Sequence, residues 1–184
     1  MDPDEVPVYE FQKFDSSIHR ILKQVRPDAG ITLYSYPIIN KIINHIIKSL
    51  SVDENITIKQ LDNIIDELFP VNIARHAKNA GNKANYHNLQ IGILEVKRAT
   101  ELIWITPDSW GVLLYISGVC EYIIAKIVEL AGNCARDDKK KKIKPKHILI
   151  AIITDNDLDK IFHKVIPVKF SIIIPDIKNL KLNI

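Results

Sequence analysis

Apolar residues recur at intervals of three and four along most of the chain, a spacing typical of α-helices rather than strands. Before about residue 88 the pattern predicts a short helix, a long helix and two further short helices. The same succession is expected after it, and hairpin signals rich in Gly are absent from the sequence. The pattern therefore predicts an all-α protein in which one helical arrangement occurs twice.

In the first half, a helix is expected from about residue 15, capped by Asp15 or Ser16. A long helix begins near Ser35, with Pro37 in its first turn, where a missing N–H costs little. The apolar positions of this helix form a wide stripe, consisting of Ile38, Ile39, Ile42, Ile43, Ile46, Ile47 and Leu50. Since Ile has a lower helix propensity than Leu, we expect this helix to depend on packing on two sides.

Two shorter helices and a junction follow. Thr57 and Gln60 predict a capping box for a helix that runs to about Phe69. A proline then ends it, and a further short helix is expected over residues 73–79. The polar residues 81–88 contain no long Gly/Ser or Pro stretch, so we expect the two halves to be held closely together.

The second half repeats this succession. A short helix is expected over residues 93–102, and Thr106, Pro107 and Ser109 open a long one. The core face of the long helix is expected to be Val112, Leu113, Ile116, Val119, Cys120, Ile123, Ile127 and Leu130. A helix with apolar residues on two faces needs an intertwined partner, and the other half supplies one. The chain is therefore predicted to form one domain with one core.

The end of the chain contains a basic segment and two more helices. Pro145 starts the first, and Thr154 and Asp157 are expected to cap the second, which runs to about Lys164. The remaining residues contain two prolines and are expected to be extended. Residues 139–146, called the lysine segment below, form a basic stretch that precedes the first of these helices and includes its start. The stretch contains Lys139, Lys140, Lys141, Lys142, Lys144 and Lys146.

Charge is distributed unevenly although the net charge is only +3. Residues 1–88 hold 10 basic and 11 acidic residues, whereas residues 89–184 hold 15 basic and 11 acidic residues. A surface for a polyanion should therefore lie in the second half. The lysine segment could contact phosphates with the help of the following helix N-terminus, but a solvated loop or a localisation signal would have the same composition.

The sequence offers no enzymatic site. The six histidines are scattered without ligand spacing, so neither a metal nor a cofactor is expected. Cys120 and Cys134 fall in or beside one helix, which favours free thiols over a disulfide. No phosphate-binding loop or nucleophile elbow is present, and we expect no small-molecule substrate. No signal peptide and no run of about 18 apolar residues is seen, so neither secretion nor a membrane span is expected.

Several longer stretches resemble histones. The sequence EYIIAKIVELAGNCARD at 121–137, continued by DKKKKIKPKHILIAI to residue 152, resembles the long helix, second loop and third helix of histone 2A. IIIPDI at 172–177 resembles its docking segment. In the first half, ILKQVRPDAGI at 21–31 and ARHAKNAGNKA at 74–84 resemble parts of histone 2B. The resemblance covers about residues 14–182, in an order similar to the histone doublets of large DNA viruses.

This resemblance implies two intertwined histone folds in one chain, forming a pseudo-heterodimer. The implied divisions are a short acidic segment (1–13), a histone 2B-like fold (14–84), a junction (85–91), a histone 2A-like fold (92–164) and a docking tail (165–184). The implied function is packaging of duplex DNA without reading its sequence, in nucleosome-like particles with a histone 4–3 type doublet or tetramer. The implied location is the virion and the host nucleus or a viral factory.

The resemblance also implies particular DNA contacts. Lys139, Lys140 and Lys142 match the phosphate-facing loop, where Lys142 replaces the usual minor-groove Arg. The other lysines of the segment are also expected to bind DNA, namely Lys141, Lys144 and Lys146. Arg98, with its neighbour Lys97, matches a phosphate contact on a first helix, and Thr32 could donate a hydrogen bond from a first loop. Some departures weaken this set: Glu95 stands in place of an Arg, and Asp53 and Glu54 stand in a loop that is basic in the family.

Other expectations concern protein partners. The acidic surface patch of the family is matched by Glu121, Glu129, Asp155 and Asp157, whereas Lys126 replaces an acid and should weaken docking of an Arg. The long helix of the first half is about three turns shorter than in the family, so we expect weaker attachment to the tetramer. The acidic replacements leave one alternative open, a histone-fold interaction module of a transcription or chromatin complex.

Overall fold

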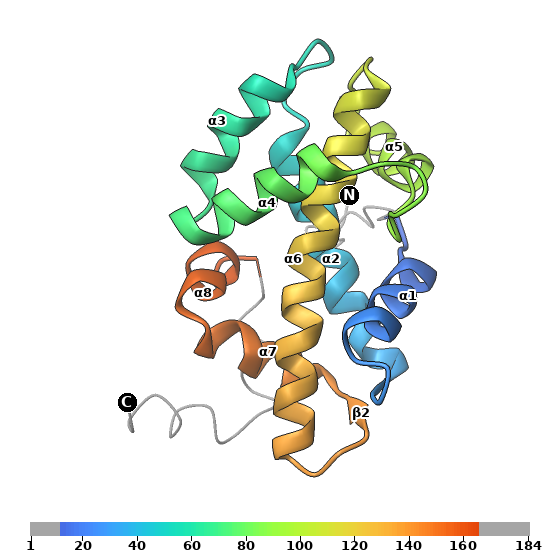
Figure 1. Cartoon of the computed structure of the whole chain (residues 1–184), viewed down its shortest axis with the longest axis vertical. Helices are drawn as coiled ribbons and strands as arrows, with labels where there is room; N and C mark the ends of the chain where they lie inside the picture. Colours follow the sequence, from blue (N-terminus) through green and yellow to red (C-terminus); the bar gives the residue numbers. More distant parts are fainter. Residues whose placement is uncertain (1–11, 166–184) are drawn as a thin grey trace, which may run out of the picture.

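One long helix, α6 (Trp110–Asp137), runs through the centre of the molecule and the other helices pack around it (Figure 1). The computed structural model describes residues 12–165. Within them the order is α1 (Asp15–Val25), β1 (Gly30–Ile31), the 3-10 turn η1 (Leu33–Ser35), α2 (Tyr36–Leu50), α3 (Ile58–Leu68), α4 (Val71–Lys83), α5 (Ile93–Glu101), α6, β2 (Lys142–Ile143), α7 (Pro145–Thr154) and α8 (Asn156–Phe162). This part of the chain is thus mostly helical, as the pattern predicts, but it also contains one short pair of strands that the pattern does not predict.

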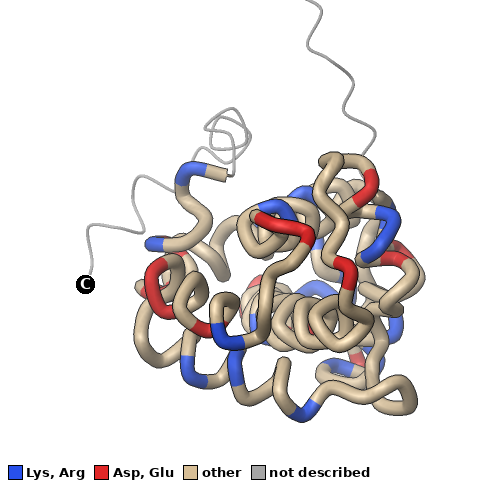
Figure 2. Tube along the Cα trace, turned by 90° about the horizontal axis from the view of Figure 1, so that it is seen from above, with Lys and Arg blue, Asp and Glu red and all other residues tan. Residues whose placement is uncertain are grey.

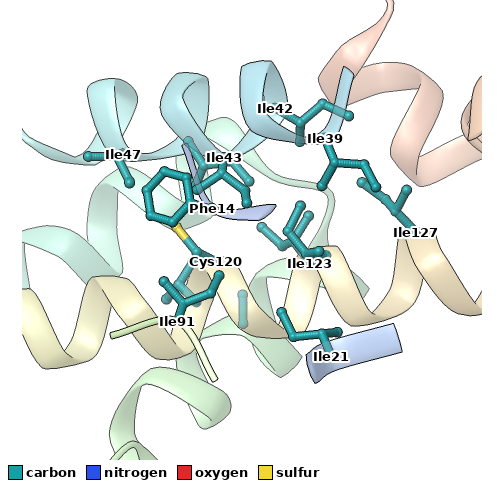
Figure 3. Close-up of a cluster of buried hydrophobic side chains, with 14 of the residues drawn as sticks. Phe14, Ile21, Ile39, Ile42, Ile43, Ile47, Ile91, Cys120, Ile123 and Ile127 are labelled. Atoms are coloured by element: carbon teal, nitrogen blue, oxygen red, sulfur yellow. The ribbon is translucent and has the colours of Figure 1, made fainter. Parts of the chain in front are cut away.

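The core lies between α6 and the helices of the first half. Ile39, Ile43 and Ile47 of α2 point toward Cys120 and the isoleucines of α6 (Figure 3). Phe14 and Ile21 complete this cluster from the start of the chain and from α1, and both are buried. Because buried residues from both halves form one cluster, each half contributes apolar surface that the other covers.

The expected core face of α6 is confirmed except at its last position. All of the predicted residues from Val112 to Ile127 are buried, whereas Leu130 is only partly buried. This helix is also long and apolar enough to cross a membrane by length and composition alone. However, 67% of that apolar stretch is buried inside the protein, and packing by the other helices explains its apolar character.

Helices α4 and α6 approach each other closely where they cross. A Cβ atom on Gly118 would lie 2.7 Å from the carbonyl oxygen of Ala80, and one on Gly81 would lie 2.8 Å from the ring of Tyr115. Real Cβ atoms do not approach that closely, so both positions require glycine. The Tyr115 hydroxyl donates a hydrogen bond to Asp62 of α3, which ties the crossing to a third helix.

The structure confirms one predicted cap and corrects two. Thr57 and Gln60 form the expected capping box at the start of α3. At α1, however, neither Asp15 nor Ser16 is the N-cap residue: Phe14 is, and its own N–H donates to Oδ1 of Asn40 at 2.8 Å. Asp15 accepts a hydrogen bond from the Asn40 amide at 2.7 Å, so a contact with α2 takes up the carboxylate that was expected to cap.

The last helix has a different cap from the predicted one. Asp155, rather than Thr154 or Asp157, caps α8 by accepting from two backbone N–H groups. The predicted helix near residues 73–79 is longer than expected, because α4 extends from Val71 to Lys83. The predicted extended tail and docking segment lie outside the described residues, as does most of the acidic N-terminal segment.

Candidate nucleic-acid interface

The lysine segment lies beside the first loop of the chain, at the C-terminal end of α6. β1 pairs with β2 in parallel, with Gly30 opposite Lys142 and Ile31 opposite Ile143. Two flanking hydrogen bonds extend the pairing: the Gly30 N–H donates to the Lys141 carbonyl at 2.9 Å, and the Thr32 N–H donates to the Ile143 carbonyl at 3.0 Å. Segments about 110 residues apart in sequence therefore lie side by side (Figure 1).

The hydroxyl group of Thr32 is engaged in a hydrogen bond beside these paired segments. The hydroxyl of Ser35 donates to the Ile143 carbonyl at 3.1 Å, which uses its only proton. The hydroxyls of Thr32 and Ser35 lie 2.9 Å apart, so in this pair Thr32 must be the donor. Thr32 is thus brought to the lysine segment as expected, but its donor is engaged within the turn.

Five of the six lysines are free to meet a ligand. Lys139, Lys140, Lys141, Lys142 and Lys144 are exposed and form no ion pair with any residue that the structure describes. The sixth, Lys146, is half-buried, and its Nζ lies 2.7 Å from Oδ2 of Asp138. The predicted cluster is therefore present with five free ammonium groups, while Lys146 is paired.

The buried side chain of His147 fixes the backbone of the lysine segment by hydrogen bonds. Its side chain is fully buried, its Nδ1 accepts from the Lys144 N–H at 3.1 Å, and its Nε2 lies 3.0 Å from Asp138. A neutral ring protonated at Nε2 satisfies both contacts. Burial lowers the pKa of His147, and the Asp138 carboxylate only partly opposes this. A sequence signal for this role existed: His147 stands three residues after Lys144, the N-cap position of α7.

The carboxylates near the lysine segment have cationic partners. Lys146 and His147 together hold the pKa of Asp138 at about 2, so it is ionised at neutral pH. Asp28 pairs with Arg26 at 3.2 Å, and the hydrogen bond from that guanidinium lowers the pKa of Asp28. Because these acids are neutralised locally, the free lysines dominate the charge of this end of the molecule.

The predicted contacts on α5 are only partly available. Arg98 is exposed. Lys97, in contrast, lies 3.5 Å from Glu101 and 5.8 Å from the centroid of the Trp110 ring, so its charge is partly engaged. Glu95 has a structural role that the sequence did not reveal, since it accepts from the Gly92 N–H at 2.8 Å and from the Ser17 hydroxyl at 2.7 Å. It thereby fastens α5 to α1.

The predicted acidic patch keeps little free charge. Glu121 accepts from the N–H groups of Gln90 and Ile91, and burial raises its pKa. Asp155 caps α8 and lies 2.8 Å from Lys126. Burial opposes ionisation of Asp155, but Lys126 and the capping N–H groups outweigh it and lower the pKa.

Of the four patch residues, Glu129 alone is exposed, and Asp157 is half-buried. Seen from the end opposite the lysine segment, Lys and Arg positions are interspersed with Asp and Glu positions along the Cα trace (Figure 2). Since charges of both signs are mixed along the trace, an anionic ligand should be positioned by local clusters such as the lysine segment.

The opposite end of α6 has the contrary chemistry. There the loop 51–57 meets the loop 102–109, and the Asp108 N–H donates to the Glu54 carbonyl at 2.9 Å. Asp53 and Glu54 are exposed, as is Asp108. Trp104 is 90% exposed with a φ of 62°, an uncommon conformation for a bulky residue. This surface, called the acidic end below, does not suit a polyanion.

The described residues show no metal site or disulfide. No group of three His, Cys, Asp or Glu side chains within residues 12–165 could hold a metal ion. Cys120 and Cys134 are both free; burial raises the pKa of each thiol, and the Cys120 thiol is fully enclosed.

Comparison with known proteins identifies part of the chain as histone-like. It is 46% identical over 55 residues to a probable histone 2A, variant 5, of Arabidopsis thaliana, which covers 30% of this chain and 37% of the plant protein. It is 46% identical over 56 residues to a macro-type histone 2A of Capsaspora owczarzaki, covering 30% of this chain and 15% of that protein. The chain thus spans about a third or less of these relatives, and no family model matches it. Relatives that are structural histones agree with the expectation of no enzymatic activity.

Proposed function

We propose that this protein packages duplex DNA as a single-chain histone dimer. The observation that carries the proposal is a set of five exposed lysines at the C-terminal end of α6, on a loop fixed by the β1–β2 pairing. None of them has an ion-pair partner among residues 12–165. Ammonium groups on such a loop bind phosphates without reading bases, which suits packaging rather than sequence recognition. The histone-like segment supports the same function.

The doublet part of the proposal is supported by the order and packing of the helices. A short, a longer and a short helix occur in α1 to α3 and again in α5 to α7, and α6 packs against α1, α2 and α4 of the first half. We infer a histone 2B-like fold at 14–84 and a histone 2A-like fold at 92–164, joined by residues 85–91. In this arrangement each fold completes the core of the other.

A histone 4–3 type doublet or tetramer is the proposed protein partner, and the virion with the host nucleus or viral factory is the proposed location. α2 has 15 residues whereas α6 has 28. We infer that the shorter helix offers less surface to a tetramer, so this partner binds the first half weakly. In addition to the lysine segment, DNA contacts are proposed for the exposed Arg98 and for Lys97 and Thr32, which would have to exchange their partners Glu101 and Ser35 for phosphates. The patch proposed for protein contacts is Glu121, Glu129, Asp155 and Asp157.

A second candidate function is a histone-fold interaction module of a transcription or chromatin complex. The acidic end favours it, because exposed carboxylates repel DNA, while the exposed Trp104 and Trp110 suit a protein partner. The two functions differ in the lysine segment, which the interaction module does not need.

Reconstitution separates the two functions. Purified protein is mixed with a duplex of nucleosomal length, with and without a histone 4–3 type partner, and digested with nuclease over a salt series. A discrete protected fragment that requires the partner is the expected result. If no fragment is protected at any salt while the fold is intact, the packaging function is wrong and the interaction module is favoured.

The lysine segment is tested directly by its salt dependence. Log affinity falls as log salt rises, and replacing Lys139, Lys140 and Lys141 with Gln should make this fall shallower. The slope should decrease in magnitude by up to about 0.9 for each lysine that binds a phosphate. The matched control replaces the exposed Lys59, Lys83 and Lys160 with Gln, which removes the same charge elsewhere. Equal changes in slope for both triple variants would show that only net charge matters.

A further inference from the structure

Two large apolar side chains project from the surface beside the lysine segment. Leu33 and Tyr34, adjacent in the turn η1, are each 82% exposed. Single exposed apolar residues are ordinary, but two neighbouring ones on the loop that pairs with the lysine segment form a distinct apolar projection.

The backbone beneath these side chains is fixed rather than loose. Ser35 is fully buried, its N–H donates to the Thr32 carbonyl at 3.0 Å, and its hydroxyl donates to the Ile143 carbonyl at 3.1 Å. The Thr32 N–H donates to the same Ile143 carbonyl. Leu33 and Tyr34 are therefore presented by a turn that is hydrogen-bonded at both ends to the strand of the lysine segment, so they move with it.

The charge around the projection favours a polyanion as its occupant. The exposed lysines of the paired loop carry no partner among residues 12–165, whereas Asp28 is paired with Arg26 and Asp138 with Lys146. A neutral apolar surface of a protein partner would leave these ammonium groups unused. A polyanion that also offers apolar surface satisfies both, and a duplex does so in its minor groove, where sugar and base edges lie between two rows of phosphates.

We propose that Leu33 and Tyr34 insert as an apolar wedge into the minor groove of the duplex whose phosphates the lysine segment binds. The inference rests on the proposed DNA packaging and specifies how that same surface contacts DNA. A wedge partly unstacks a base step and kinks the duplex, and the bend brings more phosphate toward the protein.

The test uses the full chain and a duplex with a fluorophore at each end. Leu33→Ser with Tyr34→Ser should weaken binding about tenfold at every salt concentration, without changing the salt slope, because no charge is removed. Energy transfer between the fluorophores should fall as the bend disappears. The matched control is Val71→Ser with Tyr86→Ser, a pair exposed by 83% and 66% on α4 and the loop after it. It should bind and bend DNA like the unmodified protein.

The outcomes separate this inference from the proposed function. Unchanged affinity and bending in the Leu33 and Tyr34 variant, with the lysine variant still altering the salt slope, would overturn the wedge alone. A changed slope in the wedge variant would also overturn it, since these residues would then act through the lysines. Self-association that the wedge variant abolishes would identify a second copy as the occupant. Absence of salt-dependent binding by the unmodified protein would overturn both proposals.

Discussion

At the scale of the residue, His147 shows how a side chain without catalytic chemistry determines the shape of a binding surface. Its two ring nitrogens connect the backbone of Lys144 to Asp138, and Asp138 in turn holds Lys146. Protonation of Nδ1 would convert the acceptor for the Lys144 N–H into a donor. The arrangement of the lysine segment therefore depends on a neutral imidazole.

This dependence predicts a loss of stability in mild acid. Because the pKa of His147 is lower in the folded protein than its usual value of 6.5, the unfolded chain takes up the proton first as pH falls. The free energy of unfolding is highest above about pH 6.5 and declines below it. His45, whose pKa is lowered by burial and by Lys48 and Lys41, adds to the decline.

Urea denaturation at about pH 7.5 and about pH 5.5, on either side of the ordinary histidine pKa, measures this effect. His147→Asn keeps a hydrogen-bond donor and acceptor but does not titrate, so its stability should fall less between the two pH values than that of the unmodified protein. The exposed His87→Asn provides the control and should behave like the unmodified protein. An identical decline in the His147 variant would contradict the proposed neutral state.

At the scale of the element, the crossing of α4 and α6 is limited by backbone contact. Gly118→Ala should destabilise the protein by about 1–3 kcal/mol, because the new methyl group would meet the Ala80 backbone rather than a side chain that can move. Gly111→Ala in the first turn of the same helix is the control. Its nearest neighbour would be the Ser109 hydroxyl at 3.5 Å, so stability should stay equal or rise by up to about 1 kcal/mol. Thermal denaturation of both variants measures the change in stability. An equal loss of stability in the two variants would contradict the close crossing of α4 and α6.

At the scale of the whole molecule, a core shared between the two halves predicts one cooperative unfolding transition. Ile43 in α2 and Ile123 in α6 are both fully buried in this cluster. Each change to Ala should cost about 2–5 kcal/mol and shift the whole transition. Circular dichroism reports all helices, whereas fluorescence reports Trp104 and Trp110 near one end. Transitions that separate between the two probes would show that the halves unfold independently.

The helices of this protein could be predicted from sequence because their signals are local. Apolar spacing of three and four indicated each helix, and Pro37 and Pro145 placed the beginnings of α2 and α7 correctly. The Thr57 and Gln60 cap was also found, since both partners lie within one turn. Caps failed where the side chain found a distant partner, as Asp15 does with Asn40.

Only the packing of the folded chain shows which predicted site residues are free to bind a ligand. Three charged residues were predicted to bind partners, yet each is engaged by a group inside the fold: Lys146, Glu121 and Asp155. The pairing of Gly30 with Lys142 likewise joins segments that no local pattern connects. Helix formation follows from short-range spacing, whereas the availability of a charge depends on which groups the packed chain brings within a few ångströms.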